Sequence, residues 1–396
     1  MGEVMPPSRD GRAGEWVARA RELAPAIQAH RDDCERQRRL APALFQELRR
    51  AGIFNLTVPR AFGGTQVDLT AFVSVIEELS RHDGSVGWNA MIAGSYGFLA
   101  DYLPEATAKA IFDSGDALVA GTLAPTGQAD RMPGGYAISG RWSFGSGCHN
   151  ANWMVVSCRV AAARPEPAPE SPPEVRLFLL PASECHIVDS WFTAGLRGTG
   201  SHDFEIAHAR VGEDFSFPSA AFFSGPEERS TTGYRQPFFA IAPVIIAAVS
   251  LGIARDAIES FHELARSKVP RRGTVTLSQQ HTVHQRVGQA EARLRSARAY
   301  LYDTSRRLDA VRSHDAEAVT EMIAECRLAG AHAAQSCVEA VDSMFESGGG
   351  SSIYEGSRLE RCFRDVHVVT HHHMVSPSNV EMVGQYLLGF GLQAGR

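Results

Sequence analysis

The chain has 396 residues, 44% of them apolar and 21% charged, a balance typical of a soluble globular protein with about two to three domains. Its net charge of -6 argues against nucleic-acid binding, because phosphate neutralisation requires clustered Lys and Arg. Met1–Arg12 has no apolar core for a secretory signal, and the apolar stretch Phe238–Ala254 is interrupted by Pro243, which favours a buried helix over a membrane span. We therefore expect a cytoplasmic protein that binds neither nucleic acid nor membrane. Its seven cysteines lack CxxC spacing and are expected to be buried free thiols.

The first zone, residues 1–116, has the pattern of short helices joined by loops. Leu40–Ile53 carries leucines at helical spacing, and Gly52 is placed to end that helix. Asp68–Leu79 is a second amphipathic segment, and Asp68 is a suitable N-cap. The pattern predicts an N-terminal helical domain.

The second zone, residues 117–230, changes to short apolar or alternating runs separated by Gly and Pro, which indicates a β-domain. The clearest runs are Tyr136–Ser139, Trp153–Val156, Val175–Leu179 and Asp203–Ile206. The segment Ala161–Glu174 is rich in Pro and Glu and predicts a surface loop between strands, and Ala124–Gly134 is also taken as a loop.

The third zone, residues 231–396, returns to long helical periodicity in Ala242–Ala265, Gln279–Ala310 and Ala316–Phe345. Pro377 is expected to stop the helix that follows these. Ser378 and Glu381 have the spacing of a capping box that opens the last helix. Together these segments predict a four-helix bundle and an α+β fold in the order helical domain, β-domain, bundle.

Motifs for a nicotinamide or nucleotide cofactor are missing from the sequence. There is no GxGxxG fingerprint and no Walker A motif, and Gly348–Gly350 follows a helix instead of a strand. If the chain performs redox chemistry, its reducing equivalents have to come from another protein.

The segment Gly140–Cys148 is the most distinctive in the chain. On a regular strand Trp142 and Phe144 point to the same side, and this surface could pack against a flat ring system. The Ser146 hydroxyl and nearby backbone amides would then bond the heteroatoms of the ring. An ordinary strand and turn remains the alternative.

Four segments resemble the acyl-CoA dehydrogenase superfamily: Val58–Gly64, Glu77–Ser80, Asp83–Trp88 and Gly195–Ser201. The similarity extends over nearly the whole chain. It implies a helical N-terminal domain, a central β-barrel domain and a C-terminal four-helix bundle, in agreement with the zones above.

Two stretches resemble the oxygenase branch of that superfamily, which includes para-hydroxyphenylacetate hydroxylases, dibenzothiophene monooxygenases and amino-sugar nitrososynthases. One is Ala124–Gly127 followed by Trp142–Gly147, and the other is Arg361–Asp365 followed by His372. This resemblance implies the oxygenase component of a two-component monooxygenase that uses reduced FMN or FAD. It would react with O2 through a C4a-hydroperoxyflavin and hydroxylate an aromatic or polycyclic small molecule. A separate NAD(P)H:flavin reductase and a homotetramer or dimer are implied as well.

The resemblance also assigns catalytic roles. Ser146 would bond the flavin N5–H, which slows elimination of peroxide. His372 would act as an acid towards the peroxide or as a base towards the substrate. On a continuous helix Asp365 and His372 share a face, so we expect His372 to project into the cleft that Asp365 frames. Tyr96 occupies the place where some aromatic hydroxylases carry a substrate-facing histidine; it could donate a hydrogen bond, or it could be a core aromatic.

The cofactor-binding residues implied in the β-domain are Thr122, Trp142, Phe144, Ser146 and Gly147. Arg271 and Gly348–Gly349 match places where the superfamily contacts flavin phosphate or nucleotide, often from a neighbouring subunit.

Two other motifs in the sequence suggest alternatives to the oxygenase. Ile353–Ser357 resembles the segment in which many acyl-CoA dehydrogenases carry their catalytic carboxylate. In such an enzyme Glu355, with its pKa raised by burial, would remove the α-proton of a thioester; a surface glutamate at a helix N-terminus is the other interpretation. The histidines His367, His371, His372 and His373 suggest a metal, but neighbouring helical residues diverge by about 100°, so these side chains cannot converge on one ion. No metal site is therefore expected. A non-catalytic relative is the third alternative to the oxygenase.

Overall fold

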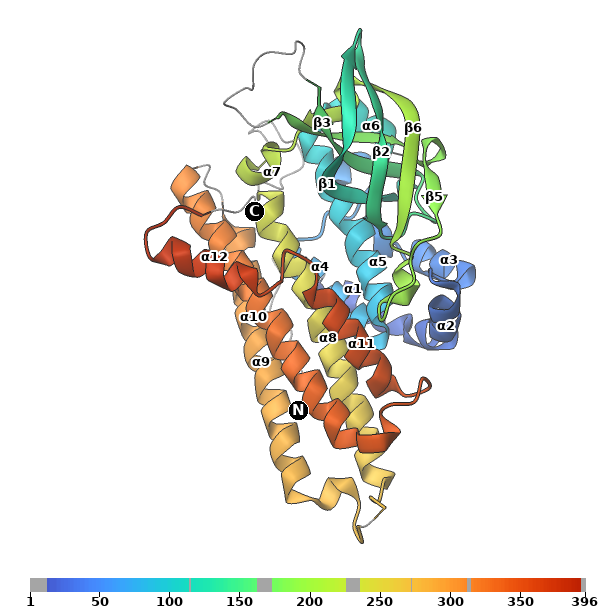
Figure 1. Cartoon of the computed structure of the whole chain (residues 1–396), viewed down its shortest axis with the longest axis vertical. Coiled ribbons are helices and arrows are strands. Elements are labelled where there is room, and N and C mark those ends of the chain that lie inside the picture. The colour runs from blue at the N-terminus through green and yellow to red at the C-terminus, as the bar shows by residue number, and fades with distance from the viewer. Residues whose placement is uncertain are drawn as a thin grey trace.

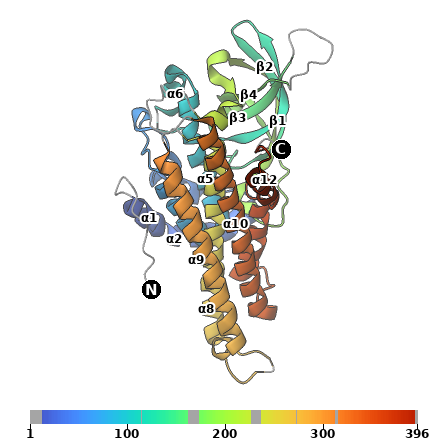
Figure 2. The same cartoon turned by 90° about the vertical axis from the view of Figure 1, so that its left-hand side faces the viewer.

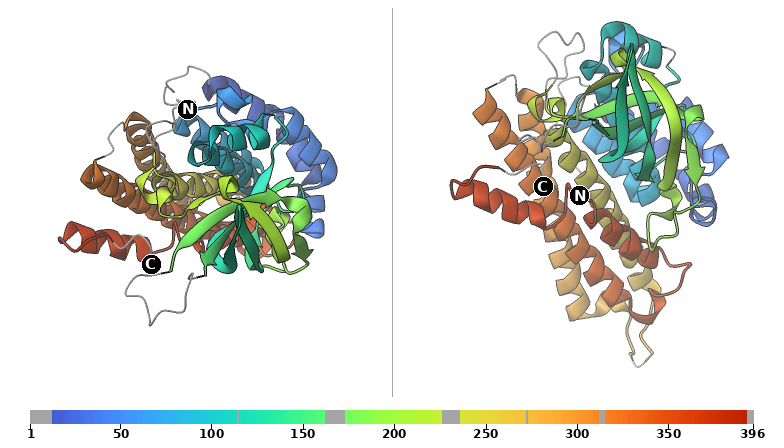
Figure 3. Two further views of the ribbon diagram at one scale, coloured as in Figure 1. Left: turned by 90° about the horizontal axis from the view of Figure 1, so that it is seen from above. Right: turned by 45° about the horizontal axis from the view of Figure 1, so that its top comes forward.

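The computed structural model describes residues 13–113, 115–161, 173–225, 236–271, 273–311 and 315–392. These residues form N-terminal helices, a curled β-sheet and a C-terminal bundle of long helices (Figure 1). Viewed from above, the three parts occupy separate sectors of the molecule (Figure 3). The predicted α+β fold, with helices, strands and helices in that order, is confirmed.

The N-terminal helices are α1 (Ala13–Glu22), α2 (Ala24–Gln37), α3 (Pro42–Arg50), α4 (Leu69–His82), α5 (Gly84–Ser95) and α6 (Glu105–Phe112), with the 3-10 turns η1 (Ile53–Asn55), η2 (Arg60–Phe62) and η3 (Tyr96–Tyr102). Asp68 caps α4 as predicted, because its carboxylate accepts a hydrogen bond from Ala71 N at 2.7 Å. Asp83 caps α5 in the same way through Ser85 N and Val86 N, at 3.0 and 3.1 Å.

In the described residues one sheet of seven strands has the order β5-β6-β2-β1-β3-β4-β7. The strands are β1 (Val119–Met132), β2 (Gly135–Gly145), β3 (Trp153–Val160), β4 (Val175–Pro181), β5 (His186–Val188), β6 (His202–Gly212) and β7 (Ser216–Pro218), and the short helices here are η4 (Ala182–Glu184), η5 (Arg197–Thr199), η6 (Glu213–Phe215) and α7 (Ala221–Ser224). No ladder joins β5 to β7 among the described strands, so the predicted barrel is an open, curled sheet. Most of the predicted loop Ala161–Glu174 lies outside the described residues.

Strand β1 differs from prediction, because most of the predicted loop Ala124–Gly134 is strand. β1 pairs antiparallel with β2 and parallel with β3, and its register against β3 shifts between Thr122 and Gly127. Pro125 lies in that shift, where the missing N–H removes no ladder bond. Gly and Pro thus mark an irregularity inside a strand here, and they do not mark its end.

The C-terminal helices are α8 (Phe238–Ser267), α9 (His281–Ala310), α10 (Ala316–Gly348), α11 (Arg358–Thr370) and α12 (Ser378–Leu387), with the turns η7 (Leu277–Gln279) and η8 (Gly349–Ser351). In the described part of the chain, α8, α9, α10 and α11 form the predicted bundle, and α8, α9 and α10 follow its long axis (Figure 2). Helix α8 is long and apolar enough to cross a membrane, but 89% of its most apolar window is buried in the protein, so it is a core helix as expected. All seven cysteines are free, and all but Cys185 are buried.

The predicted end of the first helix at Gly52 is confirmed, because α3 ends at Arg50 and Gly52 follows its C-cap with φ 77°, although Ile53 lies beyond it in η1. Two other predictions of helix ends are wrong. Helix α11 ends at Thr370, well before Pro377. Pro377 itself is the N-cap of α12, and Ser378 makes no side-chain cap there, so the proposed capping box does not form.

Helix α5 is in contact with all three parts of the molecule. It packs on α4 and α8, touches α11, and also meets β1 and the turn η5 of the β-domain. The side chains of α5, most of them buried, therefore lie close to segments that are far apart in sequence.

Candidate active site

Ser146 lies in the turn that follows β2, and its hydroxyl is buried between α5 and the β-domain. The Trp88 indole N–H donates to Ser146 Oγ at 3.0 Å. A second bond, at 2.6 Å, joins Ser146 Oγ to Ser201 Oγ. The hydroxyl is therefore held in one orientation by residues from two different parts of the fold.

His372 reaches the same place from the C-terminal segment, although the reason given for it from the sequence was wrong. Because α11 ends at Thr370, His372 does not share a helical face with Asp365; it lies in the turn beyond, where its N–H donates to Val369 O at 3.0 Å. Its ring nevertheless meets Trp88, with centroids 5.9 Å apart and planes at 60°. The Trp88 indole thus lies between Ser146 and His372.

The His372 imidazole is neutral. Burial is the main cause that lowers its pKa to about 3, and His373 and Arg327 lower it further. Met374 N–H donates to Nδ1 at 3.3 Å, which leaves the ring proton on Nε2. At neutral pH His372 is therefore not the charged acid that the resemblance implies, but an uncharged ring that donates a hydrogen bond from Nε2.

Asp365 anchors the turn Gly195–Ser201 to α11. Its buried carboxylate accepts a hydrogen bond from Leu196 N at 2.6 Å, and Arg364 NH1 donates to Ala194 O at 2.7 Å. A Cβ on Gly195 would lie 2.5 Å from the carbonyl oxygen of Arg364, so only glycine allows this approach. Burial raises the pKa of Asp365 to about 7, with a further contribution from Asp83.

Trp142 and Phe144 do not form one surface, which corrects the prediction. The β2–β6 register shifts between Trp142 and Gly145, and Phe144 has φ 67°, so the usual alternation of side chains is broken. Trp142 is fully buried, stacks on Phe204 at 5.6 Å and donates its indole N–H to Ser157 O at 2.9 Å. It has no free surface for a ligand.

Phe144 points the other way and is 68% exposed. Its ring is supported edge-on by Trp191, with centroids 6.2 Å apart. An exposed aromatic face next to a buried hydroxyl is a suitable surface for a flat ring system.

Tyr96 belongs to the core. Its hydroxyl donates to Gly121 O at 3.1 Å, and burial raises its pKa. Thr122 follows on β1, is partly exposed, and accepts a bond from Ala124 N at 3.5 Å. Gly147 adopts φ 76° and donates its N–H to Thr199 O at 3.0 Å. No described contact joins Tyr96 or Thr122 to Ser146 or His372.

Arg271 and Gly348–Gly349 lie at the end of the bundle. Lys268, at the C-terminus of α8, donates to Gly348 O. Ile253, in the middle of α8, packs near Gly84 at the start of α5. Helices rise about 1.5 Å per residue, so Lys268 lies roughly 20 Å further along the bundle than Ile253. Within one chain, Arg271 and Gly348–Gly349 are therefore far from Ser146.

The two alternatives named from sequence find little support. Glu355 is exposed, in the turn between η8 and α11, so it lacks the buried environment that this function would need. Among the histidines, His367 Nε2 pairs with Asp342 Oδ1 at 2.9 Å, and His371 is exposed. The described residues contain no group of three or more His, Cys, Asp or Glu that could hold a metal ion.

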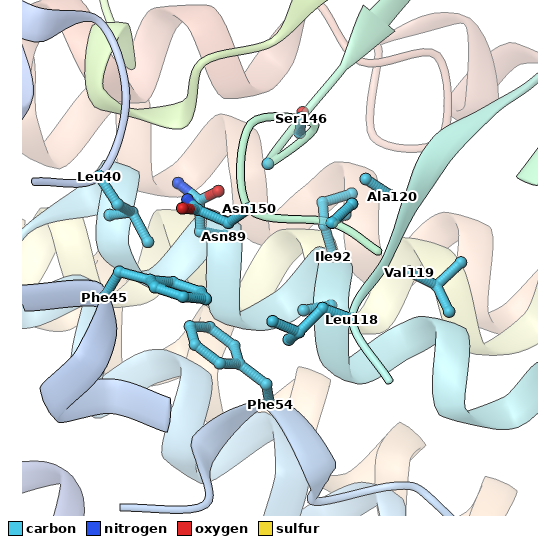
Figure 4. Close-up of a pocket in the computed structure, with 13 residues that line it drawn as sticks. Leu40, Phe45, Phe54, Asn89, Ile92, Leu118, Val119, Ala120, Ser146 and Asn150 are labelled. Atoms are coloured by element: carbon cyan, nitrogen blue, oxygen red, sulfur yellow. The ribbon is translucent and has the colours of Figure 1, made fainter. Parts of the chain in front are cut away.

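A narrow apolar pocket adjoins the turn from the N-terminal side, with about 300 Å3 of empty space, open solvent included (Figure 4). Phe45 and Phe54, stacked at 5.4 Å, form one wall. Ser146 reaches the pocket, but its oxygen points away from it (Figure 4). That oxygen is bonded to Trp88 and Ser201 instead. Neither Trp88 nor His372 lines this pocket, so it is not the space that the Ser146 hydroxyl faces.

Three residues of this site were not singled out from sequence: Trp88, Thr199 and Ser201. Their only signal was their place in the motifs Asp83–Trp88 and Gly195–Ser201, which served to identify the family. A hydrogen bond between residues 55 or 58 positions apart leaves no local pattern.

Comparisons with known proteins agree with this fold. The chain matches the acyl-CoA dehydrogenase N-terminal domain over residues 15–108 and the acyl-CoA dehydrogenase C-terminal domain over residues 244–377. It is 32% identical to an indole-3-acetate monooxygenase of Pseudomonas putida, over 90% of this chain and 89% of the relative. It is 28% identical to the oxygenase component of an FADH(2)-dependent resorcinol hydroxylase of Rhizobium sp. (strain MTP-10005), over 94% of both chains.

Solved structures show the same architecture. XiaF from Streptomyces sp., in complex with FADH2 and glycerol, superposes with a TM-score of 0.87 at 23% identity over 96% of both chains. The 3-HSA hydroxylase from Rhodococcus sp. RHA1 superposes with a TM-score of 0.86 at 25% identity, over 96% of this chain and 98% of the hydroxylase.

Proposed function

Because the chain belongs to the acyl-CoA dehydrogenase family and is similar over nearly its whole length to flavin-dependent oxygenases, we propose that it is the oxygenase component of a two-component monooxygenase. Its cofactor is reduced flavin, and its substrate is an aromatic small molecule that it hydroxylates with O2. The names of the relatives support this substrate class, since one acts on indole-3-acetate and another on resorcinol.

One observation of the structure carries the proposal: Ser146 and His372, far apart in sequence, both contact the Trp88 indole. The site also fits a flavin. The buried Ser146 oxygen can accept one more hydrogen bond, and the exposed ring of Phe144, whose backbone oxygen accepts from Ser146 N at 2.8 Å, offers an apolar face for the isoalloxazine. Reduced flavin supplies the activation of oxygen when it is bound.

The chain's own residues position groups and hold protons. Ser146 Oγ would accept the hydrogen on flavin N5, and Trp88 holds the Ser146 oxygen in place for that contact. His372, neutral and with its proton on Nε2, donates a hydrogen bond towards the reacting oxygen or the substrate. The buried Trp88 excludes water from the space between them.

The remaining partners belong to the same proposal. A separate NAD(P)H:flavin reductase delivers reduced FMN or FAD, which agrees with the missing dinucleotide fingerprint. Arg271 and Gly348–Gly349 bind the flavin phosphate or nucleotide of a neighbouring copy in a homotetramer, which agrees with their distance from Ser146 in one chain. The enzyme works in the cytoplasm.

The test is anaerobic binding of reduced FMN or FAD, followed by mixing with oxygen in a stopped-flow instrument. We expect slower flavin re-oxidation than in free solution, and product from a panel of indoles and phenols. Re-oxidation at the free-solution rate without product would refute the oxygenase. Bleaching of tightly bound FAD by an acyl-CoA would establish the dehydrogenase instead.

A further inference from the structure

A continuous chain of hydrogen bonds runs through Ser146. The Trp88 indole N–H donates to Ser146 Oγ at 3.0 Å, Ser146 and Ser201 share a bond of 2.6 Å, and Ser201 and Thr199 share one of 2.7 Å. Thr199 Oγ1 closes the chain by donating to Leu196 O at 2.8 Å. The three hydroxyls are buried, so water does not supply other partners.

The two ends of the chain set the direction of every bond between them. A carbonyl oxygen only accepts, so the single hydroxyl hydrogen of Thr199 goes to Leu196. Ser201 must then donate to Thr199, and Ser146 must donate to Ser201. The indole N–H only donates. Ser146 therefore has no hydrogen left to give and one lone pair free to accept.

We propose that this direction makes the site select reduced over oxidised flavin, and that Thr199 and Ser201 are the residues that determine the selection. The inference rests on the proposed function, in which flavin N5 faces Ser146. Reduced flavin carries a hydrogen on N5 in both its neutral and its anionic form, and it matches the free lone pair of Ser146. Oxidised flavin presents a bare lone pair at N5 and finds no donor there.

Oxidised flavin can be accommodated only if the hydroxyl hydrogen bonds reverse their direction of donation. Ser201 would then donate to Ser146, Thr199 would donate to Ser201, and the bond from Thr199 to Leu196 O would be lost. Leu196 O would keep its bonds from Thr199 N at 3.1 Å and Trp191 Nε1 at 3.2 Å. The difference between the two redox states is thus about one buried hydrogen bond, which corresponds to roughly a tenfold difference in affinity.

Thr199→Val removes Thr199 Oγ1, the oxygen that accepts the Ser201 hydrogen and so fixes the direction of the hydrogen bonds. Ser201 can then donate to Ser146 without loss, and Ser146 can donate to a bare N5. Ser201→Ala frees the Ser146 hydrogen directly, and provides a second variant if the first does not fold. Thr199→Ser keeps the hydroxyl and is the matched control.

The test measures the Kd of FMN and of FAD in the oxidised and the dithionite-reduced state, under argon, for the wild type and the three variants. We expect the ratio of oxidised to reduced Kd to fall about tenfold in T199V and S201A, and to be unchanged in T199S. An equal ratio in the wild type and both hydroxyl-free variants would overturn the inference and leave the proposed function standing. If the wild type bound neither redox state, the proposed function itself would fail.

A second readout needs no flavin. In 15N spectra of the apoprotein, the indole N–H of Trp88 reports one end of the chain and that of Trp191, bonded to Leu196 O, reports the other. We expect both resonances to move in T199V, whereas that of Trp142, bonded to Ser157 O, stays in place. A Trp88 resonance that did not respond to T199V would show that the hydroxyls are not coupled, and would overturn the inference.

Discussion

Asp365 gives the sharpest prediction, because one buried carboxylate connects α11 to the turn that carries Thr199 and Ser201. Its Oδ1 accepts the Leu196 N–H at 2.6 Å, at a residue with the unusual φ of 49°. We consider the substitution Asp365→Asn, whose amide oxygen can accept the same N–H but carries no charge. The variant therefore keeps the geometry and removes the ionisation.

The magnitude follows from the pKa of Asp365, which burial and the nearby Asp83 and Glu35 raise from 3.8 to about 7, against the opposing effects of Leu196 N–H and Arg364. A carboxyl whose folded pKa is raised binds its proton more tightly in the folded state than in the unfolded state. Its contribution to stability is therefore fully present below the unfolded pKa and is lost as pH rises towards the folded pKa. Between pH 5 and pH 7 this loss amounts to roughly 3 kcal/mol, at 1.36 kcal/mol per unit.

The assay is thermal unfolding of the wild type and D365N at pH 5 and pH 8. We expect the wild type to lose stability relative to D365N as pH rises, so that the difference in Tm shifts in favour of the variant by roughly 5 °C. D365A is the matched control, since it leaves the buried Leu196 N–H without an acceptor and should lose about 1–3 kcal/mol relative to D365N at either pH. A Tm difference between D365N and the wild type that is the same at both pH values would refute the reasoning.

Three further predictions concern the site itself. Ser146→Ala should lower the ratio of product to hydrogen peroxide about tenfold, measured with a reductase supplying reduced flavin, whereas Ala at the exposed Ser143 of β2 should not change it. Phe144→Ala should weaken flavin binding about tenfold at nearly unchanged Tm, because its ring is exposed. Trp142→Phe should leave the flavin Kd unchanged but lower the free energy of unfolding by about 1–3 kcal/mol, because Ser157 O loses the indole N–H that donates to it. Between pH 6 and 8, His372 should not contribute an inflection to the yield of product, because its pKa is about 3 and the ring stays neutral over that range. An inflection that is present in the wild type and absent in the His372→Gln variant would contradict the neutral donor.

The helical parts of the fold were predictable because their signals are local. Asp68 caps α4 through an atom three residues away, and the long apolar period of α8 is visible in any window of the sequence. The irregularities of the sheet were not. The positive φ of Phe144 reverses the direction of one side chain. The register shift of β1 allows the strand to contain Pro125, a residue that in the sequence indicates a loop. Both are set by pairing with distant strands.

The sequence named two groups that the structure brings to the same place, but it did not indicate how they are connected. Ser146 and His372 were named from motifs, but Trp88, which touches both, had no stated role. The low pKa of His372 was missed as well, because it depends on burial by segments that the sequence does not show to be adjacent. The sequence could name candidate residues for the site, but their protonation states depend on how the folded protein packs around them.

The group placed beside Trp88 also distinguishes the two activities of this fold. A dehydrogenase needs a base that takes the α-proton of its substrate, and Glu355, the candidate for it, is exposed in the turn before α11. His372 lies beside Trp88 instead, and burial leaves it too weak a base for that proton at neutral pH. A neutral imidazole with its hydrogen on Nε2 can still donate to an oxygen atom without drawing a proton from carbon. The same burial that disfavours proton abstraction therefore suits a site that transfers oxygen.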